Sequence, residues 1–286
     1  MMKTVLITGA NSGLGFETAK SLAKNADCHL ILACRNLEKA AVACKKIMAT
    51  TNNQAIDIML LDTSSLASVR NLVRDLTDKG QTIDVLINNA GMSGMAPAGQ
   101  SEGGYEIVFA TNYLGHFLLS NLLTPLYGQK AKIINVTSDL HNPPGGLTWP
   151  GIDIVAHQKG ADNSRYYYSK LCMIYLSHGL VKSLAKERPD IGVASFNPGF
   201  MADTDFSNGR AKAREDYVKQ IMPDRYSTLE QSYHALSHLV LESDLTEDNG
   251  AYYDRSTQTV HSSALSYDDG IENEVWEASL DFCKIK

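Results

Sequence analysis

Short apolar runs alternate along this chain with longer segments whose apolar residues recur at helical spacing. The apolar runs predict strands at Thr4–Ile7, His29–Ala33, Ile56–Leu61, Val85–Asn88, Lys132–Val136 and Gly192–Phe196, with an edge strand near Ala251–Tyr253. Helical patterns lie between them, for example at Leu14–Lys24, Leu37–Ala49, Ser65–Asp78 and Tyr105–Leu123. Alternating strands and helices form parallel sheets, and strands that are apolar on both faces need helices on both sides. The pattern predicts a doubly wound α/β domain with a mostly parallel sheet of seven strands.

Two polar segments interrupt this alternation. Residues 139–164 are rich in Pro, Gly, Asn and Asp, and residues 201–225 are polar with weak helical character. Ligands of doubly wound sheets bind outside the carboxyl ends of the strands, and both segments follow such ends. We expect them to form a substrate pocket; two surface loops without that role are the alternative. No repeat or linker divides the chain, so residues 1–286 are expected to form one domain.

Composition narrows the class of protein. Of the 286 residues, 44% are hydrophobic and 20% charged, and the net charge of −6 argues against nucleic acid as a general partner. No basic run indicates a membrane surface, and no apolar stretch approaches the ~20 residues that span a bilayer. A strand that begins at Lys3 leaves no room for a signal peptide or membrane anchor, so we expect a cytoplasmic protein. Five scattered cysteines without a C-x-x-C motif favour reduced thiols over disulfides or a metal site.

A glycine-rich segment follows the first predicted strand directly. Val5–Ile7 runs into Thr8-Gly9-Ala10-Asn11-Ser12-Gly13-Leu14-Gly15, where a predicted helix begins. Glycines permit a tight turn and the close approach of a ligand, and the free N–H groups of the helix attract an anion. This order predicts a site for the phosphates of a dinucleotide, and an ordinary loop is the alternative. The candidate contacts are Gly9, Asn11, Ser12, Gly13, Leu14 and Gly15.

The end of the second strand bears on the choice of coenzyme. Ala33-Cys34-Arg35-Asn36 lacks the acidic residue that would bind the ribose hydroxyls of NAD(H), and it has an arginine that would meet a 2′-phosphate. A charge-assisted bond of roughly 1.5–3 kcal/mol would favour NADP(H) by about 10- to 150-fold. We therefore predict NADP(H), with Arg35 and Asn36 as contacts; a solvated surface arginine is the alternative.

A tyrosine and a lysine stand four residues apart in Tyr166-Tyr167-Tyr168-Ser169-Lys170, on a predicted helix. Residues at this spacing share a helical face, so Tyr166 stands beside Lys170. A phenol titrates near ~10, and bringing its pKa to neutrality takes about 4 kcal/mol of preferential stabilisation of the anion. One ammonium at ~4 Å supplies roughly that much at an effective dielectric constant of ~20. The pair is an adequate acid and base unit, although helical tyrosines are usually packing residues.

Three further polar residues accompany this pair. Ser138 ends the fifth predicted strand, where its hydroxyl could bind a substrate carbonyl and stabilise developing charge. Asn112 lies inside a predicted helix, where asparagine is a mediocre helix former, and a local backbone bond is its alternative explanation. Asp62 follows the third strand and is also a candidate helix cap.

Together these motifs resemble the short-chain dehydrogenase/reductase family. They are T-G-x-x-x-G-x-G, N-N-A-G, Asn112, Ser138, Tyr166 with Lys170, and Pro198-Gly199, in the family's order from Thr4 to about Thr204. Within the family, Cys34-Arg35-Asn36, the segment 112–119, the tail around Trp276 and the long spacing from Ser138 to Tyr166 resemble retinol dehydrogenases and light-dependent protochlorophyllide reductases. The resemblance implies a single-domain Rossmann fold, a small-molecule carbonyl or alcohol substrate, and dimers or tetramers as common assemblies.

The resemblance also implies roles for individual residues. The catalytic tetrad would be Asn112, Ser138, Tyr166 and Lys170, in which Asn112 holds a water that links the lysine to solvent. Asp62 would lie beside the adenine, and the backbone at Pro198-Gly199 around the nicotinamide. The remaining coenzyme contacts would be Asn89, Ala90, Gly91, Thr204 and, from the tetrad, Tyr166 and Lys170.

We therefore expect an NADP(H)-dependent oxidoreductase that interconverts an alcohol and an aldehyde or ketone, with Tyr166 as general acid and base. A reductase of a conjugated C=C bond and a non-catalytic NADP(H)-binding regulator are the alternatives. Phe200 stands where the pigment reductases typically have a cysteine. His141 is a pocket residue or a solvated loop residue. The residues that suit a moderately apolar carbonyl are Trp149, Phe200, Met201, Phe206 and Tyr217.

Overall fold

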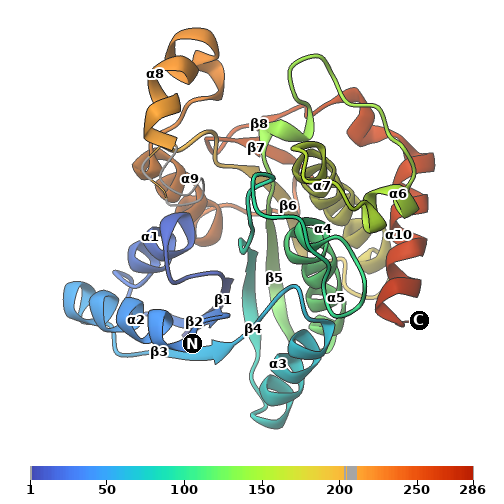
Figure 1. The fold of residues 1–286 in the computed structure, drawn as a ribbon. Helices are drawn as coiled ribbons and strands as arrows, with labels where there is room; N and C mark the ends of the chain where they lie inside the picture. Colours follow the sequence, from blue (N-terminus) through green and yellow to red (C-terminus); the bar gives the residue numbers. More distant parts are fainter. Residues whose placement is uncertain (1, 203, 205–210, 286) are drawn as a thin grey trace.

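Within residues 2–202, 204 and 211–285, which the computed structural model describes, eight strands form one sheet in the order β3-β2-β1-β4-β5-β6-β7-β8 (Figure 1). All neighbouring strands pair in parallel except β7 and β8, which are antiparallel. The strands are β1 (Lys3–Thr8), β2 (Cys28–Cys34), β3 (Ile56–Leu60), β4 (Ile83–Asn88), β5 (Tyr127–Val136), β6 (Gly192–Asn197), β7 (Tyr252–Asp254) and β8 (Thr259–Val260). The reversal of strand order beside β1 makes the fold doubly wound.

Helices cover both faces of this sheet (Figure 1). One layer holds α1 (Gly13–Leu22), α2 (Leu37–Thr51) and α9 (Leu229–Leu241). The other holds α3 (Leu66–Asp78), α5 (Gly115–Leu122), α7 (Ser164–Leu184) and α10 (Asp269–Cys283). Successive strand residues supply the two cores in turn: Val5 and Ile7 pack with the first layer, and Leu6 packs with the second. This alternation is the period of two of a β-strand, so each apolar run serves two buried faces.

Side chains fix where several helices begin. Asn36 caps α2 by accepting a bond from the backbone N–H of Lys39, and Ser65 caps α3 in the same way. Thr228 and Gln231 form a capping box at the start of α9. These caps place the first turn of each helix without help from a ligand.

The predicted doubly wound sheet and its seven strands are confirmed, but the sheet has one strand more. β8 is a two-residue strand at the edge of the sheet, too short to produce a periodic pattern. The two segments predicted as loops also contain regular structure: a 3₁₀ turn η3 (Asp139–His141) and helix α6 (Ile152–His157) in the first, and α8 (Ala211–Ile221) and η5 (Pro223–Arg225) in the second. Each is short or weakly amphipathic, so surrounding Pro, Gly and Asn residues obscured it.

The predicted helix at 105–123 divides into three parts. α4 (Ile107–Phe109) leads into a π-helical turn, η1 (Ala110–Leu114), and α5 follows. Such wide turns are frequent at functional sites. Among the described residues, no helix is long and apolar enough to cross a membrane. All five cysteines are buried and unpaired, as small apolar residues would be.

Candidate active site

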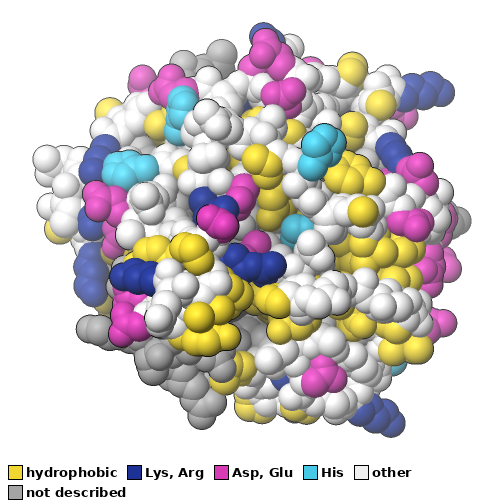
Figure 2. All heavy atoms as spheres, turned by 90° about the horizontal axis from the view of Figure 1, so that it is seen from above, with side chains coloured by type: hydrophobic (Ala, Val, Ile, Leu, Met, Phe, Trp, Pro, Cys, Tyr) yellow, Lys and Arg dark blue, Asp and Glu magenta, His cyan; other side chains and the backbone are white. Residues whose placement is uncertain are grey.

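Four adjacent strands deliver the predicted motifs to one edge of the sheet. β1 leads into the glycine segment, β4 into Asn89-Ala90-Gly91, β5 into Ser138 and β6 into Pro198-Gly199, and these strands are neighbours in the order β1-β4-β5-β6. Figure 2 looks down on the molecule from above and shows basic and acidic side chains side by side near the middle, with hydrophobic side chains around them. The sheet topology therefore assembles the sequence motifs at its carboxyl edge.

The glycine segment folds tightly against the turn after β4. Gly9 has a φ of 68°, and a Cβ there would lie 2.9 Å from the Cα of Ala90. A Cβ on Gly15 would lie 2.5 Å from Nδ2 of Asn89. Gly13 has a φ of 55°, and the nearest atoms to a Cβ there belong to Thr204 at 3.8 Å. The side chain of Ser12 does not cap α1, so this helix begins without the side-chain acceptor that α2 and α3 have.

The turn after β4 is held by hydrogen bonds to the hydroxyl of Thr8. The backbone N–H groups of Asn89 and Ala90 both donate to Oγ1 of Thr8, at 2.9 and 2.8 Å. Nδ2 of Asn89 donates to the carbonyl of Thr8 at 2.8 Å. The N-N-A-G turn and the glycine segment are thus one hydrogen-bonded unit.

Asn112 lies in the π-helical turn, and its amide is fully engaged. Nδ2 donates to the carbonyl of Met92 (3.1 Å) and to Oγ of Ser169 (3.0 Å), while Oδ1 accepts from the N–H of Met92 (2.8 Å). The local backbone bond considered from the sequence is therefore wrong, because the partners lie on two distant segments. Both amide hydrogens are used within the protein, so the side chain joins the loop after β4 to α7.

Tyr166, Lys170 and Ser138 meet between α7 and the end of β5. Nζ of Lys170 is buried, donates to the carbonyl of Val136 at 2.9 Å and lies 5.7 Å from the centre of the Tyr166 ring. Burial lowers the pKa of Lys170 to about 8. Desolvation raises the pKa of Tyr166, and a hydrogen bond with Ser138 opposes that rise. The expected lowering of the Tyr166 pKa by the lysine is therefore wrong for the chain by itself, since desolvation dominates.

The loop after Ser138 is held by a residue of the second polar segment. Oγ of Ser138 accepts from the N–H of Leu140 (3.1 Å) and donates to Oδ1 of Asp139 (3.2 Å). Nη1 of Arg225 lies 3.4 Å from Oδ2 of Asp139, and Nη2 donates to the carbonyl of Asn142 (3.1 Å). Arg225 thus joins the two predicted pocket segments beside the candidate catalytic serine.

A shallow surface pocket of about 240 Å³ lies beside this contact, lined among others by Asp139, Arg225 and Tyr252. His141 is also in its wall; the residue is buried, and its Nδ1 donates to the carbonyl of Ser138 at 2.7 Å. The interpretation of His141 as a solvated loop residue is therefore wrong.

A buried ion pair fixes the loop that precedes Asn112 against the start of α7. Nη1 of Arg165 lies 3.1 Å from Oε1 of Glu106, and both side chains are at most 1% exposed. Arg165 also donates to the carbonyls of Gly94 (2.8 Å) and Ala96. A Cβ on Gly94 would lie 2.8 Å from Cβ of Tyr166. Arg165 therefore holds this loop against Tyr166, the next residue in α7.

The candidate coenzyme contacts that follow β2 and β3 are exposed or engaged in turns. Arg35 follows β2 and is exposed, which suits a ligand contact and a surface position equally. Asn36 caps α2 because its side-chain Oδ1 accepts from the N–H of Lys39. Oδ1 of Asp62 accepts from both the N–H and the hydroxyl of Ser64, so Asp62 stabilises the turn before α3 while Ser65 caps the helix.

The turn after β6 packs against Arg255 and Ser232. Gly199 has a φ of 77°, and a Cβ there would lie 2.6 Å from Cδ of Arg255. The carbonyl of Pro198 accepts from Oγ of Ser232 at 2.6 Å. This backing holds the Pro198-Gly199 backbone in place.

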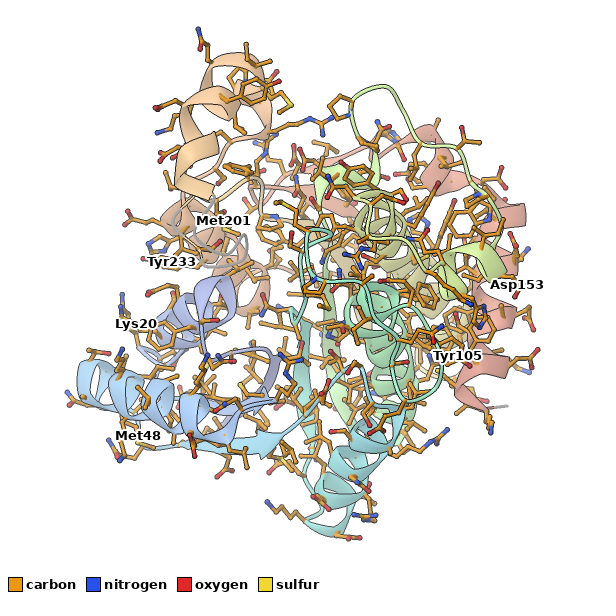
Figure 3. The ribbon with its side chains drawn as sticks, viewed as in Figure 1. Lys20, Met48, Tyr105, Asp153, Met201 and Tyr233 are labelled. Carbon is orange, nitrogen blue, oxygen red and sulfur yellow. The ribbon has the colours of Figure 1, made fainter. Side chains whose placement is uncertain are left out.

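The predicted apolar pocket residues do not all converge. Trp149 donates to Glu274 on α10 and packs edge-on against Tyr168. Met201 packs against the core on the α1 and α9 side of the sheet, as Tyr233 does (Figure 3). Tyr217 is 59% exposed on α8. Phe200 pairs with Arg225 through its backbone, and Phe206 lies outside the described residues.

Comparison with known proteins decides the family. The model of the family described as short chain dehydrogenase matches residues 3–148. The chain belongs to this family. It is 31% identical to the polyprenol dehydrogenase of Danio rerio over 99% of this chain and 87% of that protein. It is 29% identical to human retinol dehydrogenase 13 over 97% of this chain and 83% of that protein.

These relatives place the chain in the retinol dehydrogenase-like branch of the short-chain dehydrogenases. A solved structure of an uncharacterized protein from Mycobacterium paratuberculosis superposes with a TM-score of 0.70 at 26% identity, covering 99% of this chain and 94% of that one. The chain is accordingly an oxidoreductase of a family that uses NAD(P)(H). The resemblance of the motifs to this family and to its retinol dehydrogenases is confirmed.

Proposed function

We propose that this short-chain dehydrogenase interconverts an alcohol and an aldehyde or ketone with NADP(H). The observation that carries the proposal is the contact of Ser138 with Tyr166, next to the buried Lys170 and at the same sheet edge as the start of α1, which the Ser12 side chain does not cap. A carbonyl oxygen that replaced the Ser138–Tyr166 contact would receive two hydroxyl donors at once, after the Ser138 hydroxyl turns its hydrogen from Asp139 to the substrate. Two such donors favour the developing alkoxide over the ground-state carbonyl.

The residues present fit a dinucleotide. Its phosphates would lie over Gly13 and the uncapped start of α1. The residues within reach of the phosphates would be Asn11, Ser12, Leu14 and Thr204. Gly9 and Gly15 are needed nearby because a side chain at either position would collide with the turn at Asn89-Ala90-Gly91. Pro198 and Gly199 would border its nicotinamide, and Asp62 its adenine. Arg35 and Asn36 would meet a 2′-phosphate, which supports NADP(H) over NAD(H). When bound, the coenzyme supplies or accepts the hydride.

Each residue of the tetrad has a distinct task. Tyr166 donates the proton to the carbonyl oxygen in reduction and takes it back in oxidation. Ser138 donates a hydrogen bond to the same oxygen. Lys170, held by the carbonyl of Val136, brings positive charge to the site and holds the ribose. Asn112 positions Ser169 and the Met92 loop; its engaged amide supports a positioning role better than the water-holding one.

The substrate is proposed to be a moderately apolar carbonyl or alcohol. The names of the relatives, a polyprenol and a retinol dehydrogenase, support an apolar substrate. The described part of residues 201–225 meets residues 139–164 at Arg225, and we propose the two segments as the walls of the substrate pocket. The buried, unpaired cysteines suit a reducing, cytoplasmic setting.

The test is oxidation of NADPH in the dark against aliphatic, aromatic and polyene aldehydes, ketones and enones, with NADH in parallel. Alcohol products and a preference for NADPH of tenfold or more are expected. Saturation of the enone C=C bond would instead make the protein a C=C reductase. Coenzyme binding without turnover on any compound would refute the enzymatic proposal and favour a regulator.

A further inference from the structure

One buried histidine touches both halves of the candidate site, and the mechanism above does not use it. His116 on α5 is completely buried. Its Nε2 lies 3.0 Å from Oγ1 of Thr8, and its Nδ1 lies 2.9 Å from the backbone carbonyl of Asn112. Thr8 belongs to the glycine segment, and Asn112 to the π-helical turn. The imidazole therefore bridges the coenzyme side and the proton-transfer side of the site.

The hydrogen-bond partners of His116 determine which ring nitrogen carries the hydrogen. The carbonyl of Asn112 only accepts, so Nδ1 carries the hydrogen, and in a neutral imidazole Nε2 is then an acceptor. Oγ1 of Thr8 accepts from the N–H groups of both Asn89 and Ala90, which uses its two lone pairs. Its hydrogen must be donated, and Nε2 of His116 is a nearer acceptor than the carbonyl of Ile87 at 3.4 Å.

Each hydrogen bond in this series therefore has one donor and one acceptor. His116 turns the Thr8 hydroxyl so that both lone pairs face the turn at Asn89-Ala90. At its other nitrogen it holds the Asn112 carbonyl in the wide turn of the helix. Burial lowers the pKa of His116 to about 4, helped by the charge of Lys170 and opposed by the Asn112 carbonyl, so the ring is neutral at physiological pH.

We infer that His116 is a positioning residue that couples the coenzyme-binding turn, through Thr8, to the Asn112 end of the catalytic tetrad. The inference rests on the proposed function, since it assigns the two bonds to two different steps. The Thr8 bond supports coenzyme affinity, because it orders the turn that meets the glycine segment. The Asn112 bond supports turnover, because the Asn112 amide holds Ser169 and the loop beside Tyr166.

Two conservative variants separate these bonds. In His116→Asn, the amide can still donate to the carbonyl four residues back, as Asn121 does to Phe117 at 2.8 Å in the same helix, but it cannot reach Thr8. In His116→Gln, the longer side chain can accept from Thr8 but loses the Asn112 bond. The matched control is His234→Gln, since His234 is an exposed histidine on α9.

The experiment measures the Kd of NADPH by fluorescence titration and kcat at saturating NADPH with the best carbonyl of the panel. We expect His116→Asn to raise the Kd about 2- to 10-fold with kcat within about twofold, and His116→Gln to lower kcat about 2- to 10-fold with the Kd within about twofold, the range that one lost hydrogen bond produces. A purely structural role would lower the melting temperature of both variants without this split.

Equal effects of the two variants on both parameters, or no effect of either, would overturn the inference. If the wild type binds NADPH but turns over no carbonyl, the proposed function fails, and the titration alone decides the inference: weaker binding in His116→Asn but not in His116→Gln supports it. If the wild type binds no NADPH, both the proposed function and the inference are refuted.

Discussion

The ion pair between Arg165 and Glu106 gives a quantitative test of how the loop over Tyr166 is held. Both side chains are at most 1% exposed, and Nη1 of the arginine lies 3.1 Å from Oε1 of the glutamate. Arg165→Met leaves the carboxylate of Glu106 buried without its counter-charge, a change that typically destabilises a protein by about 3–5 kcal/mol. The carbonyls of Gly94 and Ala96 lose a donor as well. We therefore expect a loss near the upper end of that range.

Urea unfolding followed by circular dichroism measures this loss as a change in the free energy of unfolding. Lys20→Met is the matched control, because Lys20 pairs with Glu17 at the surface of α1 (Figure 3), where such pairs contribute about 0–1 kcal/mol. The double variant Arg165→Met with Glu106→Gln removes both charges and should lose less than the sum of the two single variants. A loss below about 1 kcal/mol in Arg165→Met, equal to that of the control, would refute the reasoning.

Three further predictions follow from single residues. Arg35→Ala should raise the Kd of NADPH about 10-fold or more and leave that of NADH within about twofold, measured by titration; equal changes for both coenzymes would contradict the 2′-phosphate contact. Gly115→Ala should destabilise the fold by about 1–3 kcal/mol in urea unfolding, because its Cβ would collide with the backbone carbonyl oxygen of Thr63. Lys170 should make stability depend on pH. Its pKa is about 8 in the folded protein and near 10.5 in the unfolded chain, so between these values only the unfolded chain binds the proton. The unfolding free energy of the wild type relative to Lys170→Met should therefore rise by about 1.4 kcal/mol per pH unit in that interval; parallel pH curves would contradict the assigned burial.

Local patterns were sufficient to predict the sheet and the motifs that it carries. Each main strand is an apolar run that serves two cores, as Val5, Leu6 and Ile7 do, and such runs are visible without a structure. The motif residues follow strand ends, and parallel strands bring those ends to one edge. The glycine segment and Ser138 could be placed at that edge for this reason.

The supporting residues could not be predicted, because their partners are remote in sequence. Arg165 meets Glu106, and His116 meets Thr8, across separations of 59 and 108 residues. Arg225 lies in a polar segment with no motif, and its contact with Asp139 depends on how two loops fold. The signal that could have drawn attention to His116 is a polar ring inside an otherwise apolar helical run, Tyr113 to Leu119.

The pKa of Tyr166 could not be predicted from the sequence either. The four-residue spacing of Tyr166 and Lys170 predicted correctly that both lie on one helix, and the structure shows that Lys170 contacts the end of β5. Spacing says nothing about desolvation, which raises the pKa of Tyr166 in the folded chain. A local pattern thus identifies the pair, and only the surrounding fold sets its electrostatics.

The central claim is that Tyr166 transfers the proton in a carbonyl reduction. The most direct test is steady-state NADPH oxidation with the best carbonyl substrate in the dark, for the wild type, Tyr166→Phe and the neighbouring Tyr167→Phe, with the Kd of NADPH measured for each. We expect Tyr166→Phe to lose at least about 100-fold in kcat, the lower range for a general acid, while its Kd and the kcat of Tyr167→Phe stay within about threefold of the wild type. Turnover by Tyr166→Phe near the wild-type rate would contradict the account.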